Sequence, residues 1–170
     1  MFVAAPDRLP HVAAKLVYGD RSLSLTPLDY EFADKTKSLV GVGEAHWLSI
    51  KVQAADGAER WERIDPCFSD VELHGLVRWL RSLESGNSGR STFEGIEPSL
   101  QFSAQWMSDQ VQFEARFCLE LHPSGLEGSG TSDQKVIWME LPRTAIEEFA
   151  DCLADELRPF PDPRPASKGG

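Results

Sequence analysis

Two glutamates at short spacing are the residues of this sequence that come nearest to a catalytic pair. Glu94 and Glu97 lie in the segment TFEGIEPSL, and two carboxylates can act as general acid and as base or nucleophile in glycoside hydrolysis. Pro98 follows immediately, and glutamates that flank strands are usually solvated. The pair therefore gives little support to an enzyme, and we expect a protein without catalytic activity.

Cysteine and histidine spacing indicates neither a disulfide framework nor a local metal site. Three cysteines lie too far apart for a CxxC pair, and an odd number favours free thiols in a reducing cytosol. The histidines show no HxH or HxxxH spacing, so a metal site would need residues to converge from distant segments. The residues concerned are Cys67, Cys118, Cys152, His11, His46, His74 and His122.

Two other motifs of enzymes and cofactor-binding proteins are incomplete. Gly41-Val42-Gly43 has two glycines at dinucleotide-loop spacing, but the third glycine is missing. The sequence contains no G-x-S-x-G pentapeptide, which marks a strand-to-helix nucleophile elbow. We expect no metal and no cofactor.

The last predicted helix carries four acidic residues on its outer side: Glu147, Glu148, Asp151 and Asp155. Like charges four residues apart destabilise a helix by roughly 0.2–0.5 kcal/mol per pair. The stripe is either an ordinary solvated face of an acidic protein or a docking surface for a basic partner, because complementary charge raises association rates.

Composition restricts the choice of partner and the number of domains. The chain has 170 residues, 41% of them hydrophobic, and a net charge of −10, which disfavours binding to nucleic acid or to an anionic membrane. We expect one domain over residues 1–162 and a disordered tail over 163–170. No signal peptide and no apolar run of about 18 residues is recognisable, so we expect a cytoplasmic protein.

Alternation and capping signals predict the elements of the first half. Residues 1–20 resemble an irregular lead-in with a short turn or edge strand near 13–18. Strand patterns follow over 22–32, with a break at Pro27, and over 47–54 and 59–64, which Asp56-Gly57 joins as a hairpin. Ser69 and Glu72 form a capping box at the start of a helix that extends to Gly86.

The second half predicts three more strands and a final helix. Strict alternation covers 100–106 and 111–121, and a short strand over 136–141 reads as buried on both faces. A helix over 144–157 begins with a second capping box, Thr144 and Glu147. Together these elements predict an α+β fold in which an antiparallel sheet of about five to seven strands has two α-helices packed on one face.

The C-terminal half resembles the WapI family of bacterial immunity proteins. The resemblance covers about residues 70–164 and rests on a tryptophan-bearing helix, the segment Glu97-Pro98-Ser99-Leu100-Gln101-Phe102 and the terminal Phe160-Pro161. It implies a small cytoplasmic protein, encoded beside a contact-dependent toxin, that binds and neutralises the toxin's C-terminal nuclease domain.

Two hypotheses of different class follow. The first is a non-enzymatic immunity-type protein that binds a basic toxin domain through Glu147, Glu148, Asp151 and Asp155. The second is a module that binds a small molecule or a peptide in a pocket between the sheet and the helices, lined by Trp47, Trp61 and Trp106. The sequence does not determine the oligomeric state.

Overall fold

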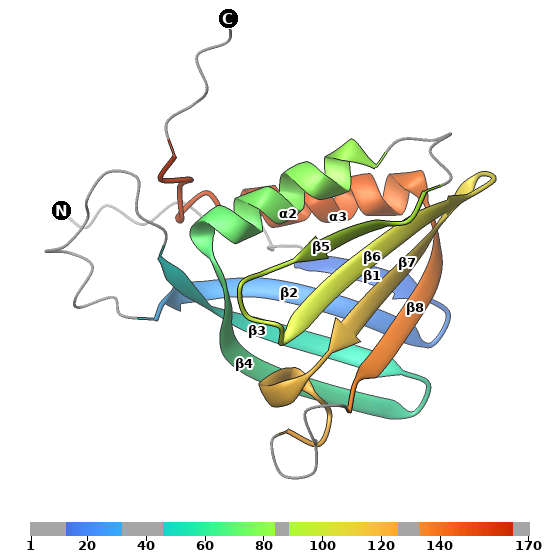
Figure 1. Ribbon diagram of the computed structural model, residues 1–170, viewed down its shortest axis with the longest axis horizontal. Helices are drawn as coiled ribbons and strands as arrows, with labels where there is room; N and C mark the ends of the chain where they lie inside the picture. The colour runs from blue at the N-terminus through green and yellow to red at the C-terminus, as the bar shows by residue number, and fades with distance from the viewer. Residues whose placement is uncertain (1–12, 32–45, 84–88, 126–132, 165–170) are drawn as a thin grey trace, which may run out of the picture.

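Two antiparallel sheets of four strands each, and two helices, make up the described fold (Figure 1). The computed structural model describes residues 13–31, 46–83, 89–125 and 133–164. The expected α+β class, with antiparallel strands and two helices, is confirmed. The strands divide into two sheets, however, where the sequence pattern indicated one.

The first sheet has the order β1-β2-β3-β4. Its strands are β1 (Ala14–Tyr18), β2 (Arg21–Tyr30), β3 (Trp47–Asp56) and β4 (Glu59–Ser69). The lead-in thus contains an edge strand. The predicted hairpin at Asp56-Gly57 is present, with Gly57 at φ 63°, where a side chain would be strained. The break at Pro27 is a register shift between Pro27 and Asp29.

The second sheet has the order β5-β6-β7-β8. Its strands are β5 (Ser91–Glu94), β6 (Leu100–Met107), β7 (Gln110–Phe117) and β8 (Lys135–Pro142). The alternation over 111–121 wrongly predicted one continuous strand. The chain leaves the sheet after Phe117, Leu119 adopts φ 50°, and residues Leu119–Leu121 form the short 3-10 helix η1.

β8 was expected to be buried on both faces, and this expectation was wrong. Ile137, Met139 and Leu141 are buried, whereas the Trp138 side chain between them is 42% exposed. The strand therefore has one face toward the core and one toward solvent, as is common in antiparallel sheets. Its apolar outer residues made it resemble a fully buried strand.

α2 (Asp70–Ser82) begins with the capping box that the sequence predicts. The Glu72 amide donates to the Ser69 hydroxyl at 3.3 Å, and the Ser69 amide donates to the Glu72 carboxylate at 2.8 Å. Leu73, Leu76, Val77 and Leu80 form its buried stripe. These contacts satisfy amides at the start of the helix and fix its apolar face toward the sheets.

α3 (Arg143–Glu156) begins one residue earlier than predicted and without the second capping box. Pro142 is the N-cap residue, so no side chain caps the helix, and the Glu147 carboxylate instead pairs with Arg143 at 2.6 Å. The predicted core stripe is confirmed, since Ile146, Phe149, Ala150, Leu153 and Leu157 are all buried.

Both helices lie side by side along one side of the molecule (Figure 1), and α3 also contacts β1 and β8, one strand from each sheet. Neither helix is long and apolar enough to cross a membrane. The segment after α3 is fixed to the fold by Phe160, whose side chain is 7% exposed and packs edge-on against Tyr30. The Phe160 carbonyl accepts a hydrogen bond from Nε2 of His74 at 2.7 Å.

Candidate functional site

The four acidic residues of the predicted binding stripe are all exposed on α3. Three of them pair with arginines. Asp151 accepts from Arg81 of α2 at 2.7 Å, Asp155 accepts from Arg158 at 2.7 Å, and Glu147 accepts from Arg143. Glu148 has no ion pair among the described residues. Spacing along the helix places Arg143 and Arg158 within reach of Glu147 and Asp155, whereas Arg81 comes from another helix and reaches Asp151 only through the fold.

These three ion pairs are open to solvent, which limits their strength. The side chains of Arg81 and Asp151 are 52% and 70% exposed, and those of Arg158 and Asp155 are 77% and 61% exposed. Exposed pairs of this kind contribute roughly 0–1 kcal/mol. A cation from a partner can therefore displace the arginines at little cost.

A second group of acidic residues surrounds Asp65 on β4. Partial burial and then the charges of Glu120, Glu97 and Glu31 raise the pKa of Asp65 to about 6. Asp65, Glu97 and Glu120 form no ion pair within the described residues. Sequence reasoning missed this group because its members lie in separate segments that only the fold brings together.

Glu94 and Glu97 do not form a shared catalytic cleft. Glu94 lines a hollow on the outer face of β5, β6 and β7 that does not include Glu97. Glu97 instead acts on Asp65 through its charge. Both glutamates are exposed.

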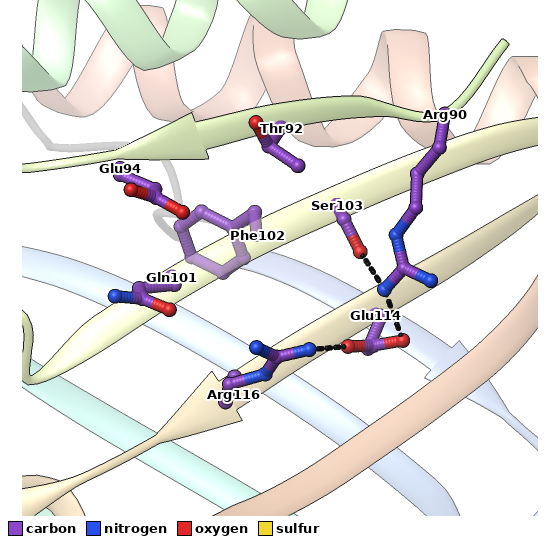
Figure 2. A pocket seen from close by; sticks show the side chains of 8 residues that line it. All are labelled: Arg90, Thr92, Glu94, Gln101, Phe102, Ser103, Glu114 and Arg116. Atoms are coloured by element: carbon purple, nitrogen blue, oxygen red, sulfur yellow. Dashed lines mark hydrogen bonds and ion pairs between the residues drawn. The ribbon is translucent and has the colours of Figure 1, made fainter.

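The hollow beside Glu94 is polar and small, with a volume of about 210 Å³. Figure 2 shows Arg90 and Arg116 reaching toward Glu114 from opposite sides, each at 2.6 Å, and Arg90 also donates to Ser103 at 2.7 Å. Partial burial acts to raise the pKa of Glu114, but the bonds from Arg116 and Arg90 outweigh it and hold the pKa below its ordinary value. Arg90, Arg116 and Glu114 thus satisfy one another, whereas Glu94 lies at the same hollow without an ion pair to a described residue.

The three tryptophans of the predicted pocket do not line a common cavity. Trp61 is 8% exposed, contacts Phe117 and donates its indole N–H to the Leu121 carbonyl at 3.2 Å. Trp106 lines a separate hollow of about 60 Å³ beside Leu83. Trp47 begins β3 and lines neither the hollow beside Trp106 nor the groove that Trp61 borders.

Cysteine and histidine positions give no catalytic or metal centre in the described segments. No group of three or more potential ligands has metal-binding geometry there. Burial raises the pKa of the Cys67 thiol far above its usual range, and burial also raises that of Cys118 despite nearby Arg116. Neither thiol is thereby activated as a nucleophile. His11 and the Gly41-Val42-Gly43 segment lie outside the described residues.

Similarity to solved structures is distant. The plant transcriptional regulator PBF-2 is 13% identical with a TM-score of 0.44, over 88% of this chain and 81% of its own. WHY3 from Arabidopsis thaliana is 15% identical with a TM-score of 0.43, over 88% of this chain and 86% of its own. These scores are too low to support an inference about function. A comparison with curated proteins found no match.

Similarity to a protein family is much more extensive. The model of the immunity protein WapI-like family matches residues 16–161, a wider span than the sequence motifs indicated. Several residues of those motifs are structural: Leu100 and Phe102 are buried at the start of β6, and Phe160 is buried beside Tyr30. The chain belongs to the WapI-like family of immunity proteins.

Proposed function

We propose that this protein is a non-enzymatic, cytoplasmic immunity protein that binds and neutralises a cationic, nuclease-like toxin domain. Glu147, Glu148, Asp151 and Asp155 are the proposed contacts. The observation that carries the proposal is the exposure of all four carboxylates on one rigid helix, with three of them held only by exposed arginines.

The chemistry of a nuclease explains why such a surface can inhibit one. A domain that grips a nucleic-acid backbone needs cationic side chains, and carboxylates can occupy the positions of phosphates. The net charge of −10 speeds the approach of a basic partner. Lysines and arginines of the toxin then replace Arg81, Arg143 and Arg158 as partners of the stripe.

The alternative, a module that binds a small molecule, receives less support from the described cavities. Ligand pockets usually have volumes of about 300–1,000 Å³ and are mainly apolar. The hollow in Figure 2 has only about 210 Å³. The groove that Trp61 borders has about 460 Å³, but its lining includes Lys15, Arg60 and Glu62, and it lies on the outer face of the β1–β4 sheet, not between the sheet and the helices. The separation of Trp61 and Trp106 also removes the aromatic lining on which this alternative was based.

The proposal implies that a toxin gene lies beside this one, and the direct test uses the C-terminal domain of that toxin. A variant with Glu147→Gln, Glu148→Gln, Asp151→Asn and Asp155→Asn should bind that domain roughly 100-fold more weakly, since close interfacial charge pairs contribute about 1.5 kcal/mol or more. It should also protect RNA from the domain less well. Calorimetric titration and RNA cleavage give the two measurements.

A matched control removes the same charge elsewhere. Glu94→Gln, Asp109→Asn, Asp133→Asn and Glu140→Gln change four carboxylates outside α3, and none of these forms an ion pair with a described residue. Equal loss of affinity in both variants would show that only net charge matters. Unchanged binding of the α3 variant would exclude the stripe, and no binding of the wild-type protein would refute the proposed function.

A further inference from the structure

The outer face of the β1–β4 sheet is the opposite of α3 in charge. Strand pairing places Lys15, Ser24, Gln53 and Glu62 in one row across the sheet, and Val17, Ser22, Ala55 and Arg60 in the next. Along each strand these residues alternate with core residues such as Leu16, Leu23 and Leu25, so their side chains lie on the face of the sheet opposite the core. No helix of the described chain covers this face (Figure 1).

The cations of this face are unusual because no acidic side chain of the described segments pairs with them. Most described lysines and arginines form ion pairs, as Arg21, Arg78 and Lys135 do. Lys15 and Arg60, together with Lys51 on the neighbouring row, form none with a described residue, and Glu62 is bound to Gln53 at 2.7 Å. In a protein with a net charge of −10, this face is locally basic.

A groove of about 460 Å³ runs over these rows between Lys15 and Arg60. Ser24 lines it and is 4% exposed, and its hydroxyl has no hydrogen-bond partner in the structure. Buried hydroxyls are nearly always paired, and an unpaired one is costly. Lys15 and Gln53 are the neighbours of Ser24 in its row, and both side chains are exposed and line the same groove.

Apolar side chains flank the groove. Val17 is 55% exposed on β1, and Ile64 is 60% exposed on β4, paired opposite Lys51. The face therefore combines cations, an unpaired hydroxyl and exposed aliphatic groups, a combination that suits a polypeptide carrying both carboxylates and apolar side chains.

We propose that the outer face of the β1–β4 sheet binds an acidic polypeptide segment of a second protein, distinct from the toxin. One carboxylate of the segment lies between Lys15 and Arg60 and accepts a hydrogen bond from the Ser24 hydroxyl. Apolar side chains of the segment pack on Val17 and Ile64. This interface does not depend on the toxin-binding stripe, which lies on α3.

Nucleic acid fits this face less well than an acidic polypeptide. Surfaces that bind single strands combine cations with aromatic side chains on which bases stack. Here the Trp61 ring is buried and points inward against Phe117, so it offers no exposed face on which a base can stack. A symmetric pairing of two copies through this face would bring its cations together.

The test uses the full chain and a short fluorescein-labelled peptide of glutamate and leucine, with fluorescence anisotropy as the measurement. The double variant Lys15→Glu, Arg60→Glu should bind the peptide at least 10-fold more weakly. Its control, Arg143→Glu, Arg158→Glu, makes the same change in net charge on the α3 side and should weaken binding less than 3-fold. Both pairs are exposed, and circular dichroism verifies that each variant is folded.

Ser24→Ala separates a binding role from a structural one. Removing an unpaired buried hydroxyl should leave the melting temperature equal or higher, yet weaken peptide binding about 3- to 10-fold. Loss of stability with unchanged binding would contradict the assigned role of Ser24.

Three further outcomes would overturn the proposal. They are no binding of the peptide, equal binding of a peptide with glutamine in place of glutamate, and tighter binding of single-stranded RNA or oligo-dT than of the acidic peptide. A dimer in light scattering that the Lys15→Glu, Arg60→Glu variant abolishes would instead assign this face to self-association. None of these results changes the binding of the toxin domain, so the two proposals fail separately.

Discussion

At the scale of single residues, Glu72 joins two parts of the chain. Its carboxylate accepts from the Ser69 amide at the start of α2 and, at 2.6 Å, from the Ile96 amide in the loop between β5 and β6. Next to Ile96, Gly95 lies so close to Phe68 that a Cβ there would be 2.8 Å from the ring. One carboxylate thus caps a helix and holds a tightly packed loop.

Replacing Glu72 with alanine should destabilise the protein by about 1–2 kcal/mol, because it removes the capping contact and leaves the Ile96 amide without its acceptor. Urea unfolding followed by circular dichroism measures the change. Glu94→Ala serves as the control, since the Glu94 side chain is exposed and forms no side-chain hydrogen bond or ion pair with a described residue. Equal effects in the two variants would contradict this account.

Asp65 provides a prediction about pH. Its pKa is about 6 in the folded protein, above the ordinary value of 3.8, so the folded state holds the proton more tightly than the unfolded state does. The contribution of Asp65 to the free energy of unfolding is therefore fully present below about pH 4 and is lost as the pH rises through 6.

Asp65→Asn should remove this fall and stabilise the protein at neutral pH, by less than about 1 kcal/mol because the site is partly solvated. Melting temperatures measured across the range from pH 4 to 8 test the difference. A variant no more stable than the wild type at neutral pH, or equally pH-dependent, would show that burial and its acidic neighbours do not strain Asp65.

At the scale of residues, the sequence predicts contacts between near neighbours in the chain but not contacts between residues far apart in it. The Ser69–Glu72 capping box spans three residues and could be read directly. The bond from Ile96 to Glu72, the charges around Asp65 and the pair Arg81–Asp151 join residues far apart in the chain. Of the candidate site, the positions of the carboxylates and the local pairs Arg143–Glu147 and Arg158–Asp155 follow from spacing, whereas the Arg81–Asp151 pair does not.

At the scale of elements, the errors have physical causes. Leu119 and Leu121 continue the alternation of β7, but the positive φ of Leu119 turns the chain into η1, where Leu121 is still buried. An alternating pattern of apolar residues indicates which side chains are buried. It does not distinguish a strand from a 3-10 turn that buries the same residues. The predicted capping box of Thr144 and Glu147 is absent because Pro142 is the N-cap residue of α3 and Glu147 pairs with Arg143.

The segment that follows α3 acts as a fixed element of the fold. Phe160 packs against Tyr30 at 5.4 Å between ring centroids, and Asp162 pairs with Arg78 of α2. Phe160→Ala should therefore destabilise the protein by about 3 kcal/mol, since a buried phenylalanine is lost and a cavity is left.

Thermal unfolding of Phe160→Ala and of the nearby exposed control Pro159→Ala tests this contribution. Pro159 is exposed after the helix end, so its replacement should have little effect. A loss below about 1 kcal/mol for Phe160→Ala would show that the site collapses without cost or that the segment is not docked.

At the scale of the whole molecule, a single sheet was predicted and two are present. Alternation identifies strands and their buried sides, and short turns identify hairpin partners such as β3 with β4. It does not show which hairpins share a sheet. Here Trp61 and η1 meet where the two sheets approach each other. Arg21 of β2 donates to the Trp138 carbonyl of β8, and Lys135 of β8 pairs with Asp56 of β3.

Lys135 is the centre of that link between sheets. From β8 it pairs with Asp56 at 2.8 Å and Glu59 at 2.8 Å in the other sheet, and its ammonium lies 5.9 Å from the centroid of the Trp61 ring. The hydrogen bond from Lys135, more than the partial burial that opposes it, holds the pKa of Asp56 below its ordinary value, and Arg21 adds to this effect.

Lys135→Met keeps the apolar stem and removes the charge, so it should cost about 1 kcal/mol at neutral pH. Because the pKa of Asp56 is lowered in the folded state, the stability from this contact is present above the ordinary value of 3.8 and is lost as the pH falls below it. The difference between variant and wild type in urea unfolding should therefore shrink as the pH is lowered from 7 to 3. A difference that stays constant over this range would mean that Lys135 joins the sheets through its stem packed on Trp61 and not through its charge.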